Sequence, residues 1–482
     1  MEIHHLEEVK LKFGQGVKAY DPRKGLLKGG PYGPSGNEDQ LDFKIINCGV
    51  IATSPYIAKT RHFIEKISFG FDANSTTYGD LGFPGLGKRS PLLFSLKVLK
   101  QWEEKILDHE IRTIENISDK NQRKNKLFEI IETKIQNIVQ VDPPPHLIFI
   151  TLNEKIINLF RRPGIYSDDI IFANRNYPDS VYESEGDIDF HNIVKILGMK
   201  YDIRTQLLKP TTLTFEGTED QVTTSWNLAV GLYYKANGIP WRFSEFENDV
   251  CYVGISFFRD FSEEEVYMNS SMAQVFLHTG ENYILRGDKF QWERTKRDRN
   301  PHLDEGKAES LINKIVDLYY SKKNTYPSRM VIYKTSNFHP EEINGFYKNK
   351  GKIRDIDMIT IIDRKKFRLY RHGNYPVMRG TMISTEERKR CFLYTYGYLP
   401  PMETYPGMKV PSPLEVKQFT GNADIKKICK EILTLTRLDW NNIKYCQKMP
   451  VTLAFAKKVG EILSERRSED ISNIKIHYRY YM

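Results

Sequence analysis

Four side chains in the middle of the chain could together bind a phosphate group. His191 and Lys195 stand four residues apart, which places both on one face of a helix. Gln206 follows where the chain should turn back toward a sheet, and Lys235 ends an apolar helix expected over 225–236. A terminal phosphate carries about two negative charges and needs converging donors of this kind. Spacing alone favours a solvated helix face, and a cation near a helix C-terminus also offsets the helix dipole.

A glycine-rich segment at residues 82–88 has the GxxxxGK spacing of a nucleotide-binding P-loop. Arg89 stands where a P-loop needs Ser or Thr to ligate Mg²⁺, and Pro84 removes one backbone donor from the phosphate cradle. We therefore expect a surface turn. A phosphate-binding enzyme that uses this turn and Lys88 is kept as an alternative.

A strand expected over 252–257 carries Ser256 where a two-metal nuclease of α/β fold places an aspartate. Phosphodiester cleavage by two Mg²⁺ ions about 4 Å apart needs several carboxylates. The nearby acids, Asp260 and the glutamates at 263–265, form a turn-like charged cluster that we expect to be solvated.

Composition excludes several classes of protein. The 482 residues include 71 Lys and Arg against 62 Asp and Glu, a net charge of +9 that permits a polyanionic partner without proving one. The sequence contains no run of about eighteen apolar residues, so it predicts no transmembrane helix. Residues 1–5 lack the pattern of a secretory signal. Five scattered cysteines without a CxxC pair argue against a disulfide framework or a cysteine zinc site. We expect a reduced, cytoplasmic protein.

Hydrophobic patterning predicts two α/β halves that meet near residue 245. An apolar run at 43–52, followed by helical spacing at 58–67, is typical of the start of an α/β unit. The charged stretch 96–139 is predicted to be helical, and 146–152 to be a buried parallel strand. Further helices are expected at 187–198, 225–236, 308–320, 424–435 and 451–463, and further strands at 250–257, 329–334 and 356–362.

Several segments, taken in order, resemble the domains of Argonaute proteins. The segments that resemble the PIWI domain are 254–256 (GIS), 328–335 (SRMVIYKT), 435–442 (LTRLDWNN) and 449–457 (MPVTLAFAK). Upstream, His191, Lys195, Gln206 and the stretch 226–238 resemble the MID domain. The resemblance covers nearly the whole chain, including 21–32, and leaves no room for N or PAZ domains. The sequence is therefore similar to short prokaryotic Argonautes.

The resemblance implies an α/β fold in which a Rossmann-like MID domain precedes an RNase H-like PIWI domain. The implied boundaries are a linker-like segment at 1–40 packed on the core, the MID domain at 41–245 and the PIWI domain at 246–482. The implied pocket for the 5′-phosphate of a guide strand consists of His191, Lys195, Gln206 and Lys235, with His191 in place of the commoner Tyr. The C-terminal carboxylate of Met482 and a Mg²⁺ ion would lie beside that phosphate.

The resemblance also implies that the chain does not cleave its target. The positions of the metal ligands fall on Ser256, Thr335 and Lys457, which offer neither a carboxylate nor an imidazole. The fourth position, the family's glutamate finger, falls in the region of Glu281 and the loop around Gly287. Residues expected to contact nucleic-acid backbone are Arg204, Lys209, Lys334 and Arg437.

The implied function is recognition of a target strand through a bound guide strand, without cleavage of the target. A 5′-phosphorylated guide, RNA by resemblance, would pair with complementary single-stranded DNA, and pairing would activate a separate protein. Proteins similar to this one form a heterodimer with an APAZ-containing partner that carries a TIR or sirtuin-like, NAD-consuming effector, in immunity against phages or plasmids. The alternative is an active guide-directed nuclease with relocated carboxylates, for which Asp260, Glu281 and Asp363 are candidates.

Overall fold

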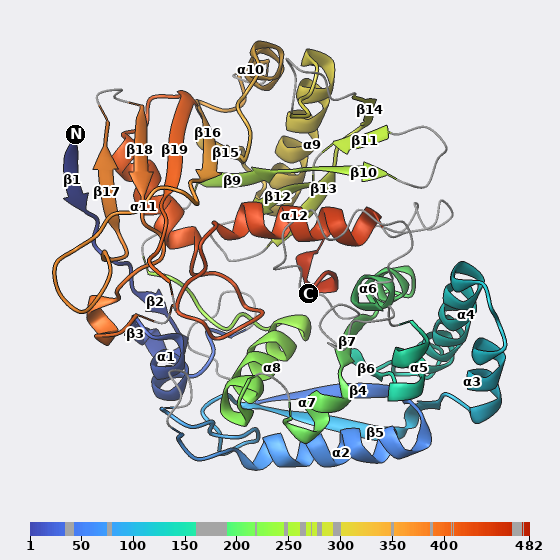
Figure 1. Ribbon diagram of the computed structural model, residues 1–482. Helices are drawn as coiled ribbons and strands as arrows, with labels where there is room; N and C mark the ends of the chain where they lie inside the picture. The colour runs from blue at the N-terminus through green and yellow to red at the C-terminus, as the bar shows by residue number, and fades with distance from the viewer. Residues whose placement is uncertain are drawn as a thin grey trace. The chain divides into compact units, whose positions relative to one another are not determined.

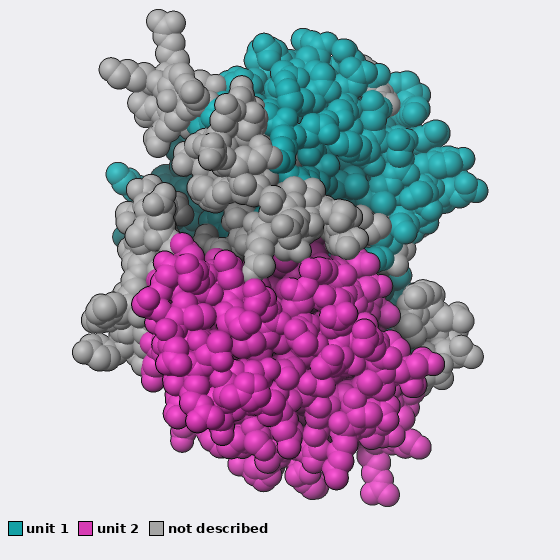
Figure 2. Space-filling model, turned by 90° about the vertical axis from the view of Figure 1, so that its right-hand side faces the viewer, with its two compact units in different colours: residues 1–40, 239–464, 476–478 teal, residues 41–238, 465–475, 479–482 magenta. Residues whose placement is uncertain are grey.

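The computed structural model divides the chain into two compact units, which Figure 2 distinguishes by colour. Unit 1 comprises residues 1–40, 239–464 and 476–478, and unit 2 comprises 41–238, 465–475 and 479–482. The residues that the structure describes are 1–33, 43–74, 80–160, 190–216, 219–244, 249–260, 267–270, 272–276, 282–292, 300–348, 351–385, 389–405, 407, 409–464, 475 and 477–482. The predicted boundary at 245 thus lies outside the described residues, and the last four residues group with unit 2 instead of the second half.

Unit 2 contains a parallel four-stranded sheet in the order β5-β4-β6-β7 (Figure 1). Its strands are β4 (Lys44–Ala52), β5 (Phe94–Lys105), β6 (Leu147–Thr151) and β7 (Arg204–Leu208). Helices connect successive strands, as parallel pairing requires: α2 (Ser54–Phe69), α3 (Asp108–Glu115), α4 (Lys120–Val139), α5 (Glu154–Leu159) and α6 (Phe190–Lys200). Isoleucines of the strands and of α4, such as Ile51, Ile148 and Ile135, share one buried core.

The predicted helix over 96–139 is wrong in its first part, because residues 94–105 form strand β5. This strand lies at the edge of the sheet and pairs only with β4 among the described strands. An edge strand tolerates charged side chains on its solvated side, so its charge pattern resembles that of a solvated helix. The prediction of a buried parallel strand at 146–152 is confirmed by β6.

Two further helices complete unit 2: α7 (Pro210–Thr214) and α8 (Gln221–Lys235). Helix α8 begins at Asp220, whose carboxylate accepts from the backbone N–H groups of Val222 and Thr223. It ends before Asn237, which has a left-handed φ of 68°. The helix predicted over 225–236 is therefore confirmed, with an earlier start.

Unit 1 is built on a nine-stranded sheet in the order β1-β17-β18-β19-β16-β15-β9-β12-β13 (Figure 1). The central strands β9, β15 and β16 are parallel, and the flanking pairs are antiparallel. The bounds are β1 (Glu2–His5), β9 (Val250–Ile255), β12 (Met272–Phe276), β13 (Asn282–Arg286), β15 (Arg329–Lys334), β16 (Asp355–Asp363), β17 (Thr381–Ser384), β18 (Arg390–Leu393) and β19 (Leu414–Thr420).

The described part of unit 1 also contains two small sheets and five α-helices. The sheets are β3-β2-β8 and β10-β11-β14, formed by β2 (Leu11–Lys12), β3 (Lys18–Ala19), β8 (Arg242–Phe243), β10 (Phe257–Asp260), β11 (Tyr267–Ser270) and β14 (Lys289–Gln291). The helices are α1 (Pro22–Gly29), α9 (Glu305–Lys323), α10 (Pro340–Tyr347), α11 (Ile425–Leu435) and α12 (Val451–Ser464). No described helix is long and apolar enough to cross a membrane.

The N-terminal segment is part of unit 1, and its strands belong to two sheets of that unit. Strand β1 adds an edge to the large sheet, with Ile3 opposite Ile383. Strand β2 pairs with β8, which places Leu11 opposite Phe243. Backbone hydrogen bonds of a sheet fix this segment to elements that follow it by more than 200 residues, a relationship that local composition does not encode.

Candidate functional site

Two buried lysines of unit 2 meet at one backbone carbonyl. The Nζ atoms of Lys195 on α6 and Lys235 on α8 both donate to the carbonyl oxygen of Thr205, the latter at 3.0 Å. Lys235 also donates to Gln206 Oε1 at 2.5 Å. Both lysines are at most 2% exposed. Because two ammonium groups share one acceptor, the structure concentrates positive charge at this point.

The fold of unit 2 explains why these groups meet. Strand β7 is an edge strand, so one side of its backbone is not paired with another strand among the described residues. Helix α6 precedes β7 in the chain and packs against it, and the Thr205 hydroxyl donates to the Val194 carbonyl at 3.0 Å. The last turn of α8 brings Lys235 to the same strand. The solvated-face interpretation of Lys195 is thus wrong.

The other two members of the predicted pocket are Gln206 and His191. Gln206 is half-buried, and its Nε2 donates to the Leu207 carbonyl at 3.0 Å. His191 is half-buried in the first turn of α6, one turn before Lys195. Residues 187–189, predicted to begin this helix, lie outside the described residues.

The donor set around this pocket fits an anion better than a metal ion. Met482 is buried and groups with unit 2, so its terminal carboxylate belongs to the same unit as Lys195 and Lys235. A Mg²⁺ ion prefers oxygen ligands, whereas the two ammonium groups repel a cation. The arrangement therefore gives no argument for a role of Mg²⁺ in phosphate binding, and the predicted ion at the guide phosphate stays a prediction.

Two of the four residues predicted to contact nucleic-acid backbone have partly accessible side chains in unit 2. Arg204 is half-buried on β7, with its guanidinium 4.7 Å from the centre of the Tyr480 ring. Lys209 is half-buried at the start of α7, just after β7. Both positions are compatible with a ligand that approaches this edge of the sheet.

The prediction is wrong for Lys334 and Arg437, which the structure buries. Lys334 is 1% exposed and bonded to both carboxylate oxygens of Glu342, at 2.5 and 2.7 Å. Arg437 is 3% exposed and donates to the backbone carbonyls of Val9, at 2.6 Å, and of Tyr20. Each cation stabilises the interior of unit 1, so neither is available to a nucleic-acid backbone.

Two of the three positions without metal-binding side chains lie at the carboxyl ends of adjacent strands of the large sheet. Ser256 directly follows β9 and Thr335 directly follows β15, and these strands are parallel with Ile255 opposite Lys334. Ser256 and Thr335 are therefore neighbours at the carboxyl ends of adjacent strands. The Ser256 hydroxyl is buried and has no hydrogen-bond partner among the described residues.

Helix α12 carries the third position and packs on the same strands. A Cβ atom on Gly254 would lie 2.3 Å from the Thr452 carbonyl oxygen, so only glycine permits this close approach of β9 and α12. Lys457 follows on α12, with a side chain 69% exposed and 4.0 Å from Glu461. Its ammonium group is thus accessible to a ligand.

The described residues contain no group of three His, Cys, Asp or Glu side chains that could hold a metal ion. Of the acids proposed for a relocated site, Asp363 accepts from Lys448 at 2.5 Å. Asp260 lies on β10, with a side chain outside the described part of the chain, and Glu281 and the glutamates at 263–265 also lie outside it.

The P-loop alternative at 82–88 is wrong, because its backbone donors are already used. The N–H groups of Phe83, Leu86 and Gly87 donate to the carbonyls of Phe71, Ser68 and Phe94, at 2.7, 3.0 and 2.8 Å. These bonds fold the segment into a turn that packs on its neighbours. A phosphate cradle needs such N–H groups free to face the ligand.

An exposed basic segment with aromatic residues, at 364–375, escaped the sequence analysis. It follows β16, which is parallel to β15, so it leaves the sheet at the carboxyl ends of the strands, where Ser256 and Thr335 also lie. Tyr370 is 77% exposed, and the segment contains the cations Arg364, Lys365, Lys366, Arg368 and Arg371. The interleaving of cations and aromatic rings in RKKFRLYRHGNY was the signal that could have identified it.

Aromatic contacts hold this basic segment on the sheet. Phe367 stacks on Phe392 of β18, with ring centres 5.0 Å apart, and Tyr375 stacks on Tyr398 at 4.6 Å. These contacts hold the backbone of the segment in place, which lowers the entropy cost when its cations bind a ligand.

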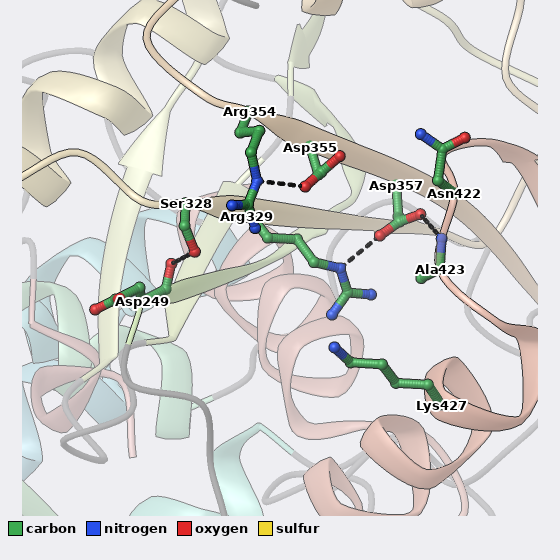
Figure 3. A pocket seen from close by; sticks show the side chains of 9 residues that line it. All are labelled: Asp249, Ser328, Arg329, Arg354, Asp355, Asp357, Asn422, Ala423 and Lys427. Carbon is green, nitrogen blue, oxygen red and sulfur yellow. Dashed lines mark hydrogen bonds and ion pairs between the residues drawn. The ribbon is translucent and has the colours of Figure 1, made fainter.

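A cavity of about 450 Å³ opens at the opposite, amino edge of the same sheet (Figure 3). Two of its cations pair with acids: Arg329 donates to Asp357 at 2.6 Å and to Glu431, which is not a lining residue, at 2.5 Å, and Arg354 donates to Asp355 at 2.9 Å. The other lining residues are Asp249, Ser328, Asn422, Ala423 and Lys427. Because opposite charges are balanced here, the cavity gives no argument for a charged ligand.

Comparisons with known proteins point in one direction. No protein-family model matches the chain. The curated protein argonaute of Aquifex aeolicus (strain VF5) is 22% identical over 242 residues, which are 49% of this chain and 31% of that protein. This similarity in sequence is partial, and the chain covers about a third of that relative.

Solved structures of Argonaute proteins share the fold of the chain. The crystal structure of A. aeolicus Argonaute matches 99% of it with a TM-score of 0.60 and 16% identity. Clostridium butyricum Argonaute, solved with a guide DNA and a 19-mer target DNA, matches all of it with a TM-score of 0.61 and 14% identity. Drosophila Piwi matches it with a TM-score of 0.60 and 12% identity. The chain spans 55–56% of the length of these three structures.

Proposed function

We propose that this chain, whose fold is that of Argonaute structures, uses unit 2 to hold the 5′-phosphate of a guide strand. The observation that carries the proposal is the meeting of Lys195 and Lys235 at the Thr205 carbonyl beside Gln206. A phosphate is the ligand whose charge balances two buried ammonium groups, and charge-assisted hydrogen bonds would hold it. In this proposal unit 2 is the MID domain and His191 faces the guide end.

Unit 1 is then the PIWI domain, which holds the guide and its target without cleaving the target. Ser256, Thr335 and Lys457 occupy the ligand positions, and none can hold a pair of Mg²⁺ ions. The exposed ammonium group of Lys457 and the basic segment at 364–375 would contact backbone phosphates instead. Base pairing supplies the sequence specificity, and the protein supplies charge and shape.

In this proposal the chain catalyses no reaction, and its role is to activate another protein when the target pairs with the guide. The sequence resemblance supports a 5′-phosphorylated RNA guide, a single-stranded DNA target and an APAZ-containing partner with a TIR or sirtuin-like effector. Recognition of foreign DNA would then switch on depletion of NAD in a prokaryotic defence system.

Nucleic acid that copurifies with the chain tests the proposal. The nucleic acid is end-labelled before and after phosphatase treatment and sized on a denaturing gel. A narrow band of short RNA that takes label only after phosphatase treatment is expected. The absence of any bound nucleic acid, even with the partner protein present, would contradict the pocket in unit 2.

A further inference from the structure

The cavity at the amino edge of the large sheet is built from the starts of three strands and one helix of unit 1 (Figure 3). Strands β9, β15 and β16 are parallel neighbours, so their first residues lie side by side at this edge. Asp249 directly precedes β9, Arg329 begins β15 and Asp357 is the third residue of β16. Lys427 comes from the first turn of α11. The cavity therefore lies at the opposite ends of these strands from the basic segment at 364–375.

The floor of the cavity is a buried charged network that keeps hydrogen-bond donors in reserve. Arg329 and Asp357 are only 6% and 1% exposed. The guanidinium of Arg329 uses three of its five N–H groups, one on Asp357 at 2.6 Å and two on Glu431 at 2.5 and 3.2 Å. Asp357 also accepts from Gln418 Nε2 at 3.0 Å and from the Ala423 N–H at 3.3 Å. These bonds fix the guanidinium in place and leave its other N–H groups for a ligand.

The rim of the cavity adds charges of both signs. Asp249 and Lys427 are exposed, and Figure 3 shows them on opposite sides of the cavity. The guanidinium of Arg329 lies between Asp357 and Lys427 in the same view. An anionic group would thus meet Arg329 and Lys427 on one side, and a cationic group would meet Asp249 on the other.

The chemistry of the lining narrows the class of ligand. Of the nine residues only Ala423 is apolar and none is aromatic, so a nucleobase or a lipid finds no stacking or apolar surface. Three of the residues are basic and three are acidic, which disfavours a ligand with a large net charge. Charge-assisted hydrogen bonds are stronger than neutral ones, so a ligand with one charge of each sign is favoured over an uncharged polyol.

The size of the cavity is compatible with a small ligand of this kind. Its volume of about 450 Å³ lies within the range of small-molecule sites, roughly 300–1,000 Å³. Strands β9 and β16 flank β15, so their backbones lie roughly 10 Å apart. This span suits the two charged ends of an amino acid or a dipeptide better than a longer chain.

We propose that this cavity binds a small zwitterion, an α-amino acid or a dipeptide, with its carboxylate on Arg329 and Lys427 and its ammonium group on Asp249. The proposal is independent of the guide pocket in unit 2, because every lining residue belongs to unit 1. It assigns unit 1 a small-molecule site at the edge of the sheet opposite to the one proposed for nucleic acid.

Isothermal titration calorimetry with the full-length protein tests the proposal. The probes are single L-amino acids and dipeptides, each with its N-acetyl form and its C-terminal amide. At least one probe should bind, and removal of either charge from it should weaken binding roughly tenfold, as for loss of a charge-assisted hydrogen bond. Asp249→Asn should remove the penalty of the N-acetyl form, and Lys427→Gln should reduce the penalty of the amide. Lys426→Gln, an exposed neighbour that does not line the cavity, should retain the wild-type pattern.

The comparison of a probe with its derivatives in each protein keeps the test independent of folding, and both substituted residues are exposed. Absence of binding for every amino acid and dipeptide at millimolar concentrations would overturn the proposal. Equal affinities of a probe and its N-acetyl form would also overturn it, as would penalties that Asp249→Asn and Lys427→Gln leave unchanged. Binding of longer charged peptides alone would overturn it as well and assign the cavity to a protein contact.

Discussion

Lys195 and Lys235 lie on different helices of unit 2 and donate to the same backbone carbonyl, that of Thr205. Such a contact brings two like charges together in a buried place, which is unfavourable unless another group compensates. The edge of the parallel sheet makes the carbonyl available, and the proposed guide phosphate supplies the compensation. The relationship therefore links the fold of unit 2 to its proposed ligand.

Replacement of both lysines, Lys195→Gln with Lys235→Gln, should abolish the preference for a 5′-phosphorylated guide. Each lysine is expected to contribute roughly tenfold or more to that preference, because its hydrogen bond to phosphate is charge-assisted. Filter binding with 5′-phosphate and 5′-hydroxyl guides measures the ratio of affinities. Lys200→Gln, on the same helix but paired with Glu132, should keep the ratio. An unchanged ratio in a folded double variant would remove the pocket assignment.

The wild-type protein should not cleave a target paired with its guide in Mg²⁺ or Mn²⁺. Ser256, Thr335 and Lys457 cannot supply the carboxylates that a two-metal site requires. Labelled target and a pure preparation are incubated with each metal and with EDTA, and products are resolved on a gel. Metal-dependent product that disappears in Asp363→Asn or Asp260→Asn would support the relocated-site nuclease.

The basic segment at 364–375 should account for part of the salt dependence of binding. Lys365→Ala with Lys366→Ala is expected to reduce the slope of log affinity against log salt concentration by about 1.4–1.8, since each phosphate contact contributes about 0.7–0.9. The slope is measured at several salt concentrations with one guide–target pair. Arg354→Ala with Lys426→Ala, two exposed cations at the opposite edge of the sheet, should leave it unchanged.

Arg437 should matter for stability and not for nucleic-acid contact. Arg437→Met leaves the carbonyls of Val9 and Tyr20 without this donor and removes one cation that acts on Glu8. Loss of a partner from a buried charged network lowers the free energy of unfolding by about 3–5 kcal/mol, which urea denaturation measures. Where the variant is folded, the salt slope of binding should equal that of wild type; a reduced slope would restore Arg437 to the groove.

The same network should make the protein sensitive to acid. Burial by itself raises the pKa of Glu8. The charges of Arg379 and Arg437 together lower this pKa by more than burial raises it, so the net pKa lies below the usual 4.5. A lowered carboxyl pKa stabilises the fold above the unfolded value, and the stabilisation is lost as the pH falls below about 4.5. Urea midpoints measured from pH 7 downward should fall less steeply in Glu8→Gln than in wild type.

The sequence indicated which residues form the proposed pocket because their spacing along two helices is encoded locally. The four-residue spacing of His191 and Lys195, and the end of an apolar helix at Lys235, follow from helical periodicity. The order of motifs along the chain likewise indicated the Argonaute fold, which the structural comparisons support. Thr335 directly follows the predicted strand 329–334, which β15 confirms, whereas Ser256, expected within a strand over 252–257, lies just after β9.

Tertiary structure alone decided which cations are available to a ligand. Lys334 and Arg437 resemble surface residues in the sequence, yet they pair with Glu342 and with N-terminal carbonyls across long stretches of chain. Asp249, Arg329 and Lys427 are far apart in sequence and line one cavity only because the starts of β9, β15 and α11 meet at one edge of the sheet. Local patterning reports which face of an element a residue occupies, whereas its partners depend on the packing of distant elements, and that packing determines whether a charge stabilises the interior or binds a ligand.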